Sequence, residues 1–172
     1  NKSPEVDKTA FVHPMSCVIG HVILGKNVMV SPFASVRADE GQPIHIGNDS
    51  NVQDGVIIHG LETEKDGQRI EKNGVEVGSG FYSVHIGQRV SLAHQVQIHG
   101  PARVEDDSFI GMKAFIFRAN IGAGCVVEPM SGVMNCTLPA GRYVPAGTIV
   151  TSQHQADQMP AIDDTYPLGS LN

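Results

Sequence analysis

The sequence predicts an all-β fold in which the chain coils into a parallel β-helix with three short strands to each turn. One observation is an aliphatic residue at every sixth position along most of the chain, and a second is a ladder of small or β-branched residues two positions before it. The aliphatic ladder comprises Val12, Val18, Leu24, Val30, Val36, Ile46, Val52, Ile58, Ile86, Leu92, Ile98, Val104, Ile110 and Ile116, and after a one-residue slip Ile121, Val127 and Val133. The small ladder comprises Ala10, Ser16, Val22, Val28, Ala34, Ile44, Ser50, Val56, Val90, Val96, Ala102, Ser108 and Ala114. A six-residue period fits neither one face of a helix nor a flat sheet, whereas it fits a coil that turns a corner every six residues.

The composition favours the same fold. The 172 residues include 19 glycines, 10 prolines and no tryptophan, and little of the sequence is typical of helix. Glycines such as Gly25, Gly47 and Gly87 follow the aliphatic position, which we interpret as chain reversals where a side chain would be in the way. The repeats resemble the hexapeptide repeats of left-handed β-helices, and the left-handed winding is expected from this resemblance rather than from the period. The expected fold class is therefore a left-handed parallel β-helix of hexapeptide repeats with a short helical or extended C-terminal tail.

We expect residues 1–172 to form a single hexapeptide-repeat domain with one long insertion and a tail. The ladder breaks between Ile58 and Ile86, where the spacing is 28 residues, so residues 60–83 form an inserted acidic loop that is rich in charge and glycine. A loop of this length in a compact repeat is usually functional or disordered. Residues 151–172 form the tail, with a short helix expected around the string QADQM.

Charge and hydropathy narrow the classes of partner. The formal net charge is -6, and no cluster of Lys and Arg offers a surface for phosphates, so we expect no nucleic-acid partner. The longest apolar runs are far short of a membrane span. The N-terminal segment has no signal-peptide apolar stretch, but the sequence begins at Asn rather than Met, so this pattern leaves the compartment open.

Two histidines occupy equivalent outward positions of neighbouring coils. His59 and His99 each follow an aliphatic ladder residue, so both side chains are expected to point away from the core. They are 40 positions apart, which is one turn of 18 residues plus 22 for the insertion. Stacked strands are ~4.8 Å apart, so two imidazoles at this spacing can share a metal ion. Arg37 falls in the same column one coil earlier, because a four-residue bulge lies between Val36 and Ile46.

His94 does not fit this column. It lies five residues before His99, on the preceding side of the coil, so within one chain the two side chains should diverge. If three chains pack as a threefold ring, however, the face of one subunit that carries His59 and His99 can meet a neighbour's His94. The expected site is then a three-histidine metal centre shared between subunits, and three histidines with an open fourth position are typical of catalytic zinc. The alternative for any one of these histidines is an isolated surface or interface residue.

Four strings in the sequence resemble the gamma-class carbonic anhydrases. They are RADEG (37–41), NVQDGVIIHG (51–60), SLAHQVQIHGPA (91–102) and FIGMKAFIF (109–117), and they occur in the family's order with near-family spacing. The resemblance covers about residues 10–159.

The resemblance implies a left-handed β-helix, a homotrimer and the reversible hydration of CO2 to bicarbonate and a proton by a metal-bound hydroxide. The metal ligands are matched here by His59 and His99 of one subunit and by His94 of its neighbour. Zinc is the default metal, and Fe2+ or Co2+ also suits imidazole ligands. Relatives with the acidic loop are often exported, so a periplasmic or extracellular location is slightly favoured over a cytoplasmic one. Family enzymes continue into a long C-terminal helix, which would begin about where this sequence stops at Asn172.

Further site residues follow from the same resemblance. Gln53 matches a residue that hydrogen-bonds the metal-bound ligand, Glu40 one that handles its proton or contacts bicarbonate, and Glu62 a proton shuttle in the acidic loop. Four other residues match a charged pair that ties subunits together near the site and two polar supports: Arg37, Asp39, Asn51 and Asp54. Subunit cohesion alone would also explain these four.

Two other functions stay open on the sequence. A hexapeptide-repeat acyltransferase would use one histidine as a general base, but one base does not need three histidines in metal register. A catalytically silent trimer that binds bicarbonate or serves as a scaffold would keep the fold and the interface without turnover.

Overall fold

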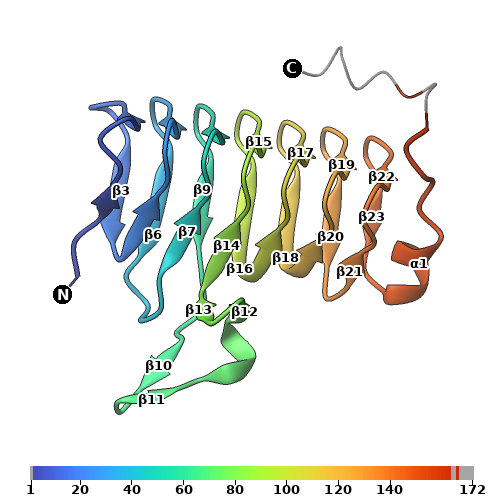
Figure 1. Cartoon of the computed structure of the whole chain (residues 1–172). Helices are drawn as coiled ribbons and strands as arrows, with labels where there is room; N and C mark the ends of the chain where they lie inside the picture. The colour runs from blue at the N-terminus through green and yellow to red at the C-terminus, as the bar shows by residue number, and fades with distance from the viewer. Residues whose placement is uncertain (1, 164–165, 167–172) are drawn as a thin grey trace.

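The chain coils into a β-helix whose turns follow one another from the N-terminus to the C-terminus (Figure 1). The computed structural model describes residues 2–163 and Tyr166. Strands of the coil pair in parallel with strands of the next turn, so three sheet faces run along the molecule. The expected fold class, a left-handed parallel β-helix of hexapeptide repeats, is confirmed.

Each face stacks one strand, or one half of a long strand, from every turn. Face 1 consists of β1 (Glu5–Val6), β4 (Val22–Leu24), β7 (Ile44–Ile46), β14 (Val84–Ile86), the second halves of β16 (Gln97–Val104) and β18 (Phe115–Ile121), and β21 (Thr137–Leu138). Face 2 consists of β2 (Phe11–Val12), β5 (Met29–Val30), β8 (Asn51–Val52), β15 (Ser91–Leu92), β17 (Phe109–Ile110), β19 (Val126–Val127) and β22 (Tyr143–Val144). Face 3 consists of β3 (Cys17–Gly20), β6 (Ser35–Ala38), β9 (Ile57–His59), the first halves of β16 and β18, β20 (Gly132–Met134) and β23 (Ile149–Val150).

The aliphatic ladder fills the interior of the coil. Its members from Leu24 to Val133 are all at most 2% exposed, whereas Val12 and Val18 in the first turn are only partly buried. The hydrophobic effect of these stacked side chains is the main force that holds successive turns together. The ladder read from the sequence is therefore the core of the molecule.

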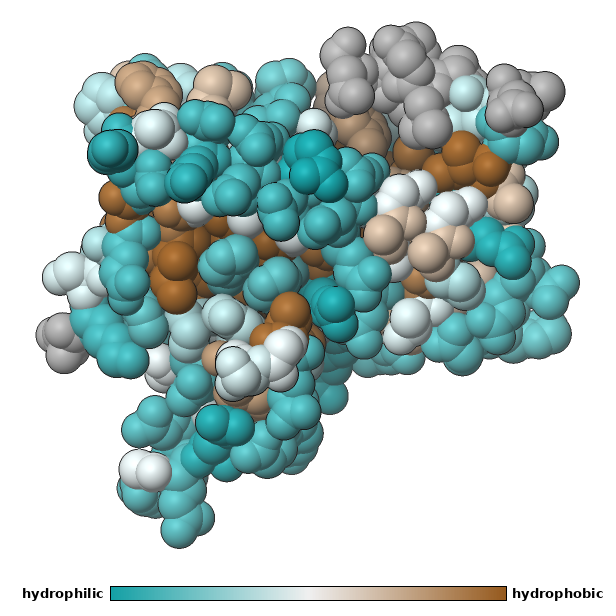
Figure 2. Space-filling model, viewed as in Figure 1, coloured by the Kyte–Doolittle hydropathy of each residue, from teal (hydrophilic) through white to brown (hydrophobic). Residues whose placement is uncertain are grey.

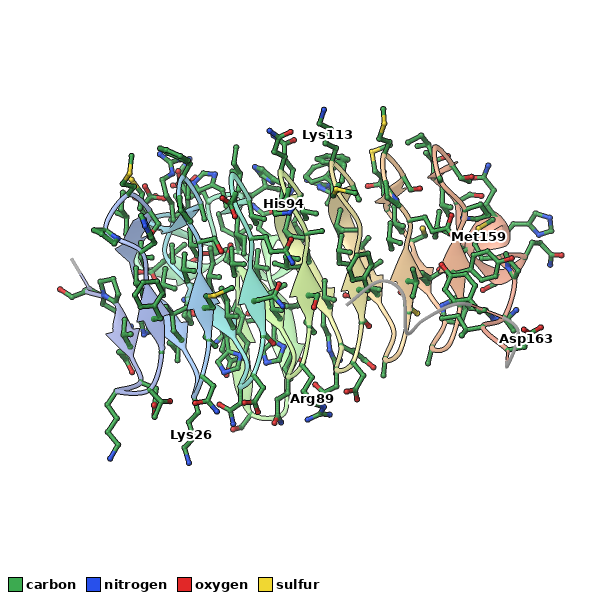
Figure 3. All side chains as sticks on the ribbon, turned by 90° about the horizontal axis from the view of Figure 1, so that it is seen from above. Lys26, Arg89, His94, Lys113, Met159 and Asp163 are labelled. Atoms are coloured by element: carbon green, nitrogen blue, oxygen red, sulfur yellow. The ribbon has the colours of Figure 1, made fainter. Side chains whose placement is uncertain are left out.

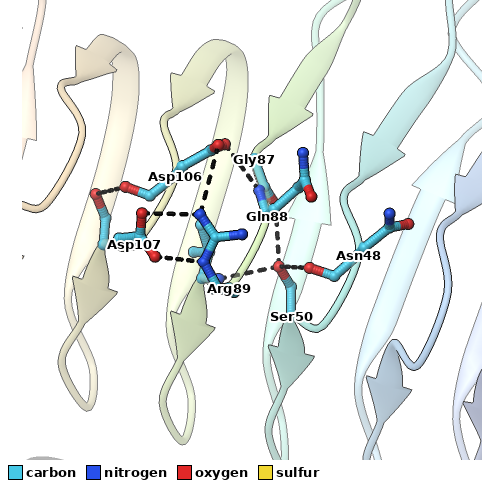
Figure 4. A network of polar contacts seen from close by, with 9 residues as sticks. Asn48, Ser50, Gly87, Gln88, Arg89, Asp106 and Asp107 are labelled. Carbon is cyan, nitrogen blue, oxygen red and sulfur yellow. Dashed lines mark hydrogen bonds and ion pairs between the residues drawn. The ribbon is translucent and has the colours of Figure 1, made fainter.

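Serines of the small ladder link one turn to the next by hydrogen bonds. The Ser50 hydroxyl, which is 2% exposed, donates to the carbonyl oxygen of Gly87 at 2.9 Å and accepts from the Val90 amide at 3.0 Å. On the surface of the same corner, Arg89 pairs with both carboxylate oxygens of Asp107 at 2.5 and 2.9 Å (Figure 4). The corner between faces 1 and 2 is therefore polar, and its buried hydroxyl is paired.

Glycines after the aliphatic position lie directly before the turns at the corners, and they allow close stacking of one turn on the next where a side chain would be in the way, as predicted. Gly47 does not have the left-handed backbone that favours glycine, but a Cβ added there would lie 2.5 Å from the carbonyl oxygen of Gly87 in the next turn. The left-handed conformation occurs instead at non-glycine corner residues such as Asp49, Arg89 and Asp107. Glycine is needed at position 47 because the backbone of the next turn occupies the space that a side chain would fill.

Gly47→Ala is therefore expected to lower the free energy of unfolding by roughly 1–3 kcal/mol, the usual cost of overpacking a rigid site. Chemical denaturation measures this. The matched control is Gly132→Ala in β20, where the nearest atom to the added Cβ is the movable Ile149 Cδ1 at 3.1 Å. Equal losses in the two variants would contradict the steric account of Gly47.

The insertion folds as two short hairpins that project from one side of the coil (Figure 1), and its projecting part is mainly hydrophilic (Figure 2). Its elements are β10 (Glu64–Lys65), β11 (Gln68–Arg69), the 3-10 helix η1 (Glu71–Asn73), β12 (Val75–Val77) and β13 (Gly80–Tyr82). At its end, the Tyr82 ring packs on two stacked imidazoles of face 1, with ring centroids 5.8 Å from His45 and 5.0 Å from His85. The insertion is thus anchored on the coil where it returns.

Acid should loosen this anchor. Burial, with help from His45 and Arg103, lowers the pKa of His85 from 6.5 to about 4, so the folded chain holds this imidazole neutral. The unfolded chain binds the proton near pH 6.5, so it takes up more protons than the folded chain between pH 6.5 and 4. The stability that neutral His85 contributes is therefore full above pH 6.5 and is lost as the pH falls towards 4.

His85→Phe should reduce the difference in unfolding midpoint measured above pH 6.5 and near pH 4, because phenylalanine keeps the stacked ring but takes no proton. His154→Phe, at an exposed position of α1, is the control and should leave the difference unchanged. An undiminished difference in His85→Phe would contradict this assignment.

The tail closes the last turn. Helix α1 (Gln153–Asp157) is capped by Ser152, whose side chain accepts a hydrogen bond from the Gln155 amide, and it overlaps the predicted QADQM helix. Further on, the Tyr166 hydroxyl donates to Glu128 Oε1 at 2.7 Å, and burial raises the pKa of this phenol. The rest of the predicted tail, residues 164–165 and 167–172, lies outside the described residues. No helix in the described part of the chain is long and apolar enough to cross a membrane.

Candidate metal centre

His59 and His99 lie side by side on face 3. Strands β9 and β16 pair in parallel with His59 directly opposite His99, and the two ring centroids are 5.7 Å apart at an interplanar angle of 82°. Both follow buried isoleucines, Ile58 and Ile98, so both rings point outwards. The predicted column of histidines in neighbouring turns is confirmed.

The His99 ring is fixed on two sides. Its Nδ1 lies 3.0 Å from the carbonyl oxygen of Gly100, so an Nδ1–H donates there and leaves the Nε2 lone pair for a ligand. In the next turn, Phe117 lies in register with His99, and the two rings pack edge to face with their centroids 5.3 Å apart. This tautomer and this restraint are what a metal-binding imidazole requires.

Three charged side chains gather at His59 Nε2. Asp39 Oδ1 and Arg37 Nη2 each lie 3.1 Å from this nitrogen, and Glu40 Oε1 lies 3.9 Å from it. The register between β6 and β9 sets Val36 opposite Ile58, which confirms the predicted place of Arg37 in the histidine column. Nε2 can accept from Arg37 in the tautomer that leaves it unprotonated, and it can donate to Asp39 when it carries the proton; a metal ligand needs the unprotonated form.

The same cluster offers oxygen ligands as well as nitrogen. Potential ligand atoms of Asp39, Glu40 and His59 all lie within 4.8 Å of one another. The single chain therefore gathers around His59, with His99 beside it, side chains that could hold part of a cation site.

His94 lies apart from this pair, as the hexad spacing predicted. It sits in the turn between β15 and β16 (labelled in Figure 3), and its side chain is 56% exposed. Its Nδ1 is 3.7 Å from Asp54 Oδ1. The single chain does not bring the three predicted metal histidines together.

Two further predicted residues lie on the side of His94. Gln53 Nε2 donates to Asn51 Oδ1 at 3.2 Å, and Asn51 Nδ2 donates to the Ser91 hydroxyl at 3.0 Å. These three residues belong to or directly follow the strands of face 2, β8 and β15. Gln53 is thus held by its neighbours on face 2, away from the His59 and His99 pair of face 3.

The predicted site residues other than Glu62 therefore form two sets. We call the first the face-3 set, which consists of Arg37, Asp39, Glu40, His59 and His99. We call the second the corner set, which consists of Asn51, Gln53, Asp54 and His94. Large apolar side chains are exposed close to both sets on face 3 and at its corner with face 2: Ile19, Phe33, Ile57, Met112 and Met130.

Glu62 lies in the insertion, three residues after His59. It is exposed, its carbonyl oxygen accepts from Asn73 Nδ2 at 2.7 Å, and its carboxylate forms no ion pair or hydrogen bond with the described residues. The carboxylate is thus free to face solvent. Sequence reasoning missed Thr63, the next residue, which is fully buried against the Glu40 segment, and also Phe117 beside His99. The hexad count could have found Phe117, since it lies 18 residues after His99, whereas Thr63 carries no periodic signal.

These features define a hexapeptide-repeat β-helix protein with a histidine-based candidate metal site on one face. A solved structure of the same fold, from a Bacillus cereus protein classed with the acetyltransferases, superposes with a TM-score of 0.64 at 21% identity, over 92% of this chain and 84% of that one. At this identity the likeness concerns the fold alone. No family model matches the chain.

The sequence relatives are more specific. The chain is 54% identical over 171 residues to a carbonic anhydrase of Methanosarcina thermophila, which covers 99% of this chain and 69% of that protein. It is 46% identical over 158 residues to the carboxysome assembly protein CcmM of a Nostoc species, of which it spans 27%. It is 32% identical over 148 residues to the mitochondrial gamma carbonic anhydrase 2 of Arabidopsis thaliana. The chain belongs to the gamma-class carbonic anhydrases, which confirms the predicted family and enzyme class and implies a metal cofactor.

Proposed function

We propose that this protein catalyses the reversible hydration of CO2 to bicarbonate at a metal held by His59 and His99 of one subunit and by His94 of the next, in a homotrimer. The observation that carries this proposal is the in-register pair of His59 and His99, with His99 oriented by the Gly100 carbonyl. Close relationship to a protein named carbonic anhydrase supports the reaction.

The residues of the face-3 set fit a divalent metal. Two imidazoles stand at a spacing that one ion can bridge, and nearby carboxylates would balance its charge. Zinc is the first choice, with Fe2+ or Co2+ as alternatives that imidazole also accepts. When bound, such an ion lowers the pKa of a water from 15.7 to about 7 and so supplies a nucleophile for CO2 at neutral pH.

The protein's own groups would handle the proton and the product. Glu40, with its carboxylate 3.9 Å from His59 Nε2, is placed to accept a proton beside the metal or to contact bicarbonate. Glu62 is placed to pass the proton to solvent, since its carboxylate is exposed and unpaired among the described residues. Gln53 would hydrogen-bond the ligand of the metal from the neighbouring subunit.

A threefold ring would join the two sets of residues. Repetition of a heterologous contact around a closed ring sets the face-3 set of each subunit against the corner set of the next. Exposed apolar residues beside both sets supply surface for such a contact. In this ring Arg37, Asp39, Asn51 and Asp54 would support the subunit boundary around the metal.

Metal analysis and a CO2 hydration assay on the wild type and on His94→Ala test the function. We expect a metal-loaded, active wild type and an inactive His94→Ala. His154→Ala, at the exposed histidine of α1, is the control and should match the wild type. A metal-free wild type, or full activity without His94, would refute the proposal, and a trimer that binds bicarbonate without turnover would favour a scaffold function.

A further inference from the structure

Thr63 is a buried polar residue between two exposed acids. Glu62 and Glu64 on either side are exposed, whereas the exposed fraction of Thr63 is 0%. It lies near the start of the insertion, at the point where the chain leaves the coil after His59. Burial of a hydroxyl is costly unless the group is paired, so this hydroxyl needs hydrogen-bond partners.

Every polar group of Thr63 is hydrogen-bonded, mainly to the segment that carries Glu40. The backbone N–H and the side-chain hydroxyl both donate to the carbonyl oxygen of Glu40, at 2.7 and 2.6 Å. The hydroxyl oxygen accepts from the Gln42 amide at 2.6 Å, and the Thr63 carbonyl accepts from the Ile70 amide at 2.8 Å. Thr63 therefore holds the bulge after β6 against the root of the insertion.

The backbone between these contacts is built for the close approach. Gly41 has a φ of +109°, which only glycine adopts readily, and a Cβ added there would lie 2.7 Å from the Thr63 hydroxyl. Glu62 directly precedes Thr63, and its backbone carbonyl oxygen accepts a hydrogen bond from Asn73 Nδ2 at 2.7 Å. The backbones of Glu40 and Glu62 are thus held in one frame.

We propose that Thr63 is a positioning residue for the reaction: its hydroxyl fixes the Glu40 segment beside His59 and sets it relative to Glu62. This inference rests on the proposed function, in which one proton passes from the attacking water to Glu40 and on through Glu62 to buffer. A carboxylate whose backbone is free to shift loses its hydrogen-bonding distance, and misplacement by about 1 Å can cost on the order of a hundredfold in rate.

Thr63→Val tests the hydroxyl, because valine has nearly the same shape and keeps the backbone bond to Glu40. We expect kcat/KM for CO2 to fall by roughly ten- to a hundredfold, with metal content and subunit mass unchanged. Thr63→Ser keeps the hydroxyl and should restore most of the activity. Hydrogen exchange of the Gln42 amide should be faster in Thr63→Val than in the wild type, since this N–H has lost its acceptor.

A double-mutant cycle with Glu40→Gln separates positioning from general stability. If Thr63 acts through Glu40, Thr63→Val costs little more once Glu40 is replaced, whereas independent effects would multiply. Multiplied losses, or a fully active Thr63→Val, would overturn the inference while an active wild type leaves the proposed function standing. An inactive wild type would refute the function itself and the role of Thr63 with it.

Discussion

Replacement of His99 by alanine is expected to remove the metal and to lower CO2 hydration to near background. His99 presents Nε2 outwards because Gly100 accepts its Nδ1–H, and its ring stands beside His59. Loss of a partner that merely orients a metal ligand costs about 10–100-fold in affinity or activity, so loss of the ligand itself should cost more. Metal analysis and stopped-flow hydration measure both effects on one sample.

Phe117→Leu is the graded control for this prediction. It removes the ring that packs edge to face on His99 but leaves the imidazole and its hydrogen bond to Gly100. We expect a smaller loss of activity with metal retained. A His99→Ala protein with full metal content would contradict this prediction, because the metal would then lie elsewhere.

Glu40→Gln should reduce turnover by roughly 10²–10⁴-fold, the usual contribution of a positioned acid or base. Glutamine has the same shape as glutamate, and the substitution leaves the backbone carbonyl of residue 40, to which Thr63 donates. The fold and the metal content should therefore be unaffected. What is lost is the carboxylate 3.9 Å from His59 Nε2. Steady-state hydration at fixed buffer concentration measures the effect.

Glu64→Gln is the matched control for Glu40→Gln. Glu64 is also an acid close to this site in the sequence, but it is exposed in β10, where it pairs with β11. We expect wild-type turnover from this variant. Equal losses in Glu40→Gln and Glu64→Gln would point to a general effect of charge and would contradict a specific role of Glu40.

The parts of the site that the sequence predicted are those that the six-residue period controls. A residue that follows a ladder position must point outwards, and 18 residues make one turn, so Arg37, His59 and His99 had to share a column. The period also predicted that His94 would diverge from His99, as it does. Since each repeat contacts only its neighbours, counting along the chain is enough to place these side chains.

Thr63, which sequence reasoning missed, lies where the period stops. Thr63 meets Glu40 across 23 positions through a bulge and an insertion, and neither has a repeat from which the contact could be counted. The glycines after ladder positions were predicted in part. Their place in the repeat indicated that a side chain would be in the way at Gly47, but only the three-dimensional spacing of turns shows that the obstacle is the backbone at Gly87.

Each proposed metal site is completed by two subunits, and co-expression of His94→Ala with His99→Ala tests this sharing most directly. Each variant alone lacks one ligand at every site and should be inactive. In a mixed trimer, one interface joins an intact His59 and His99 pair to an intact His94, so purified mixed trimers should regain about one third of the wild-type metal and activity. Mixed trimers that remain inactive and metal-free would contradict a site shared between subunits.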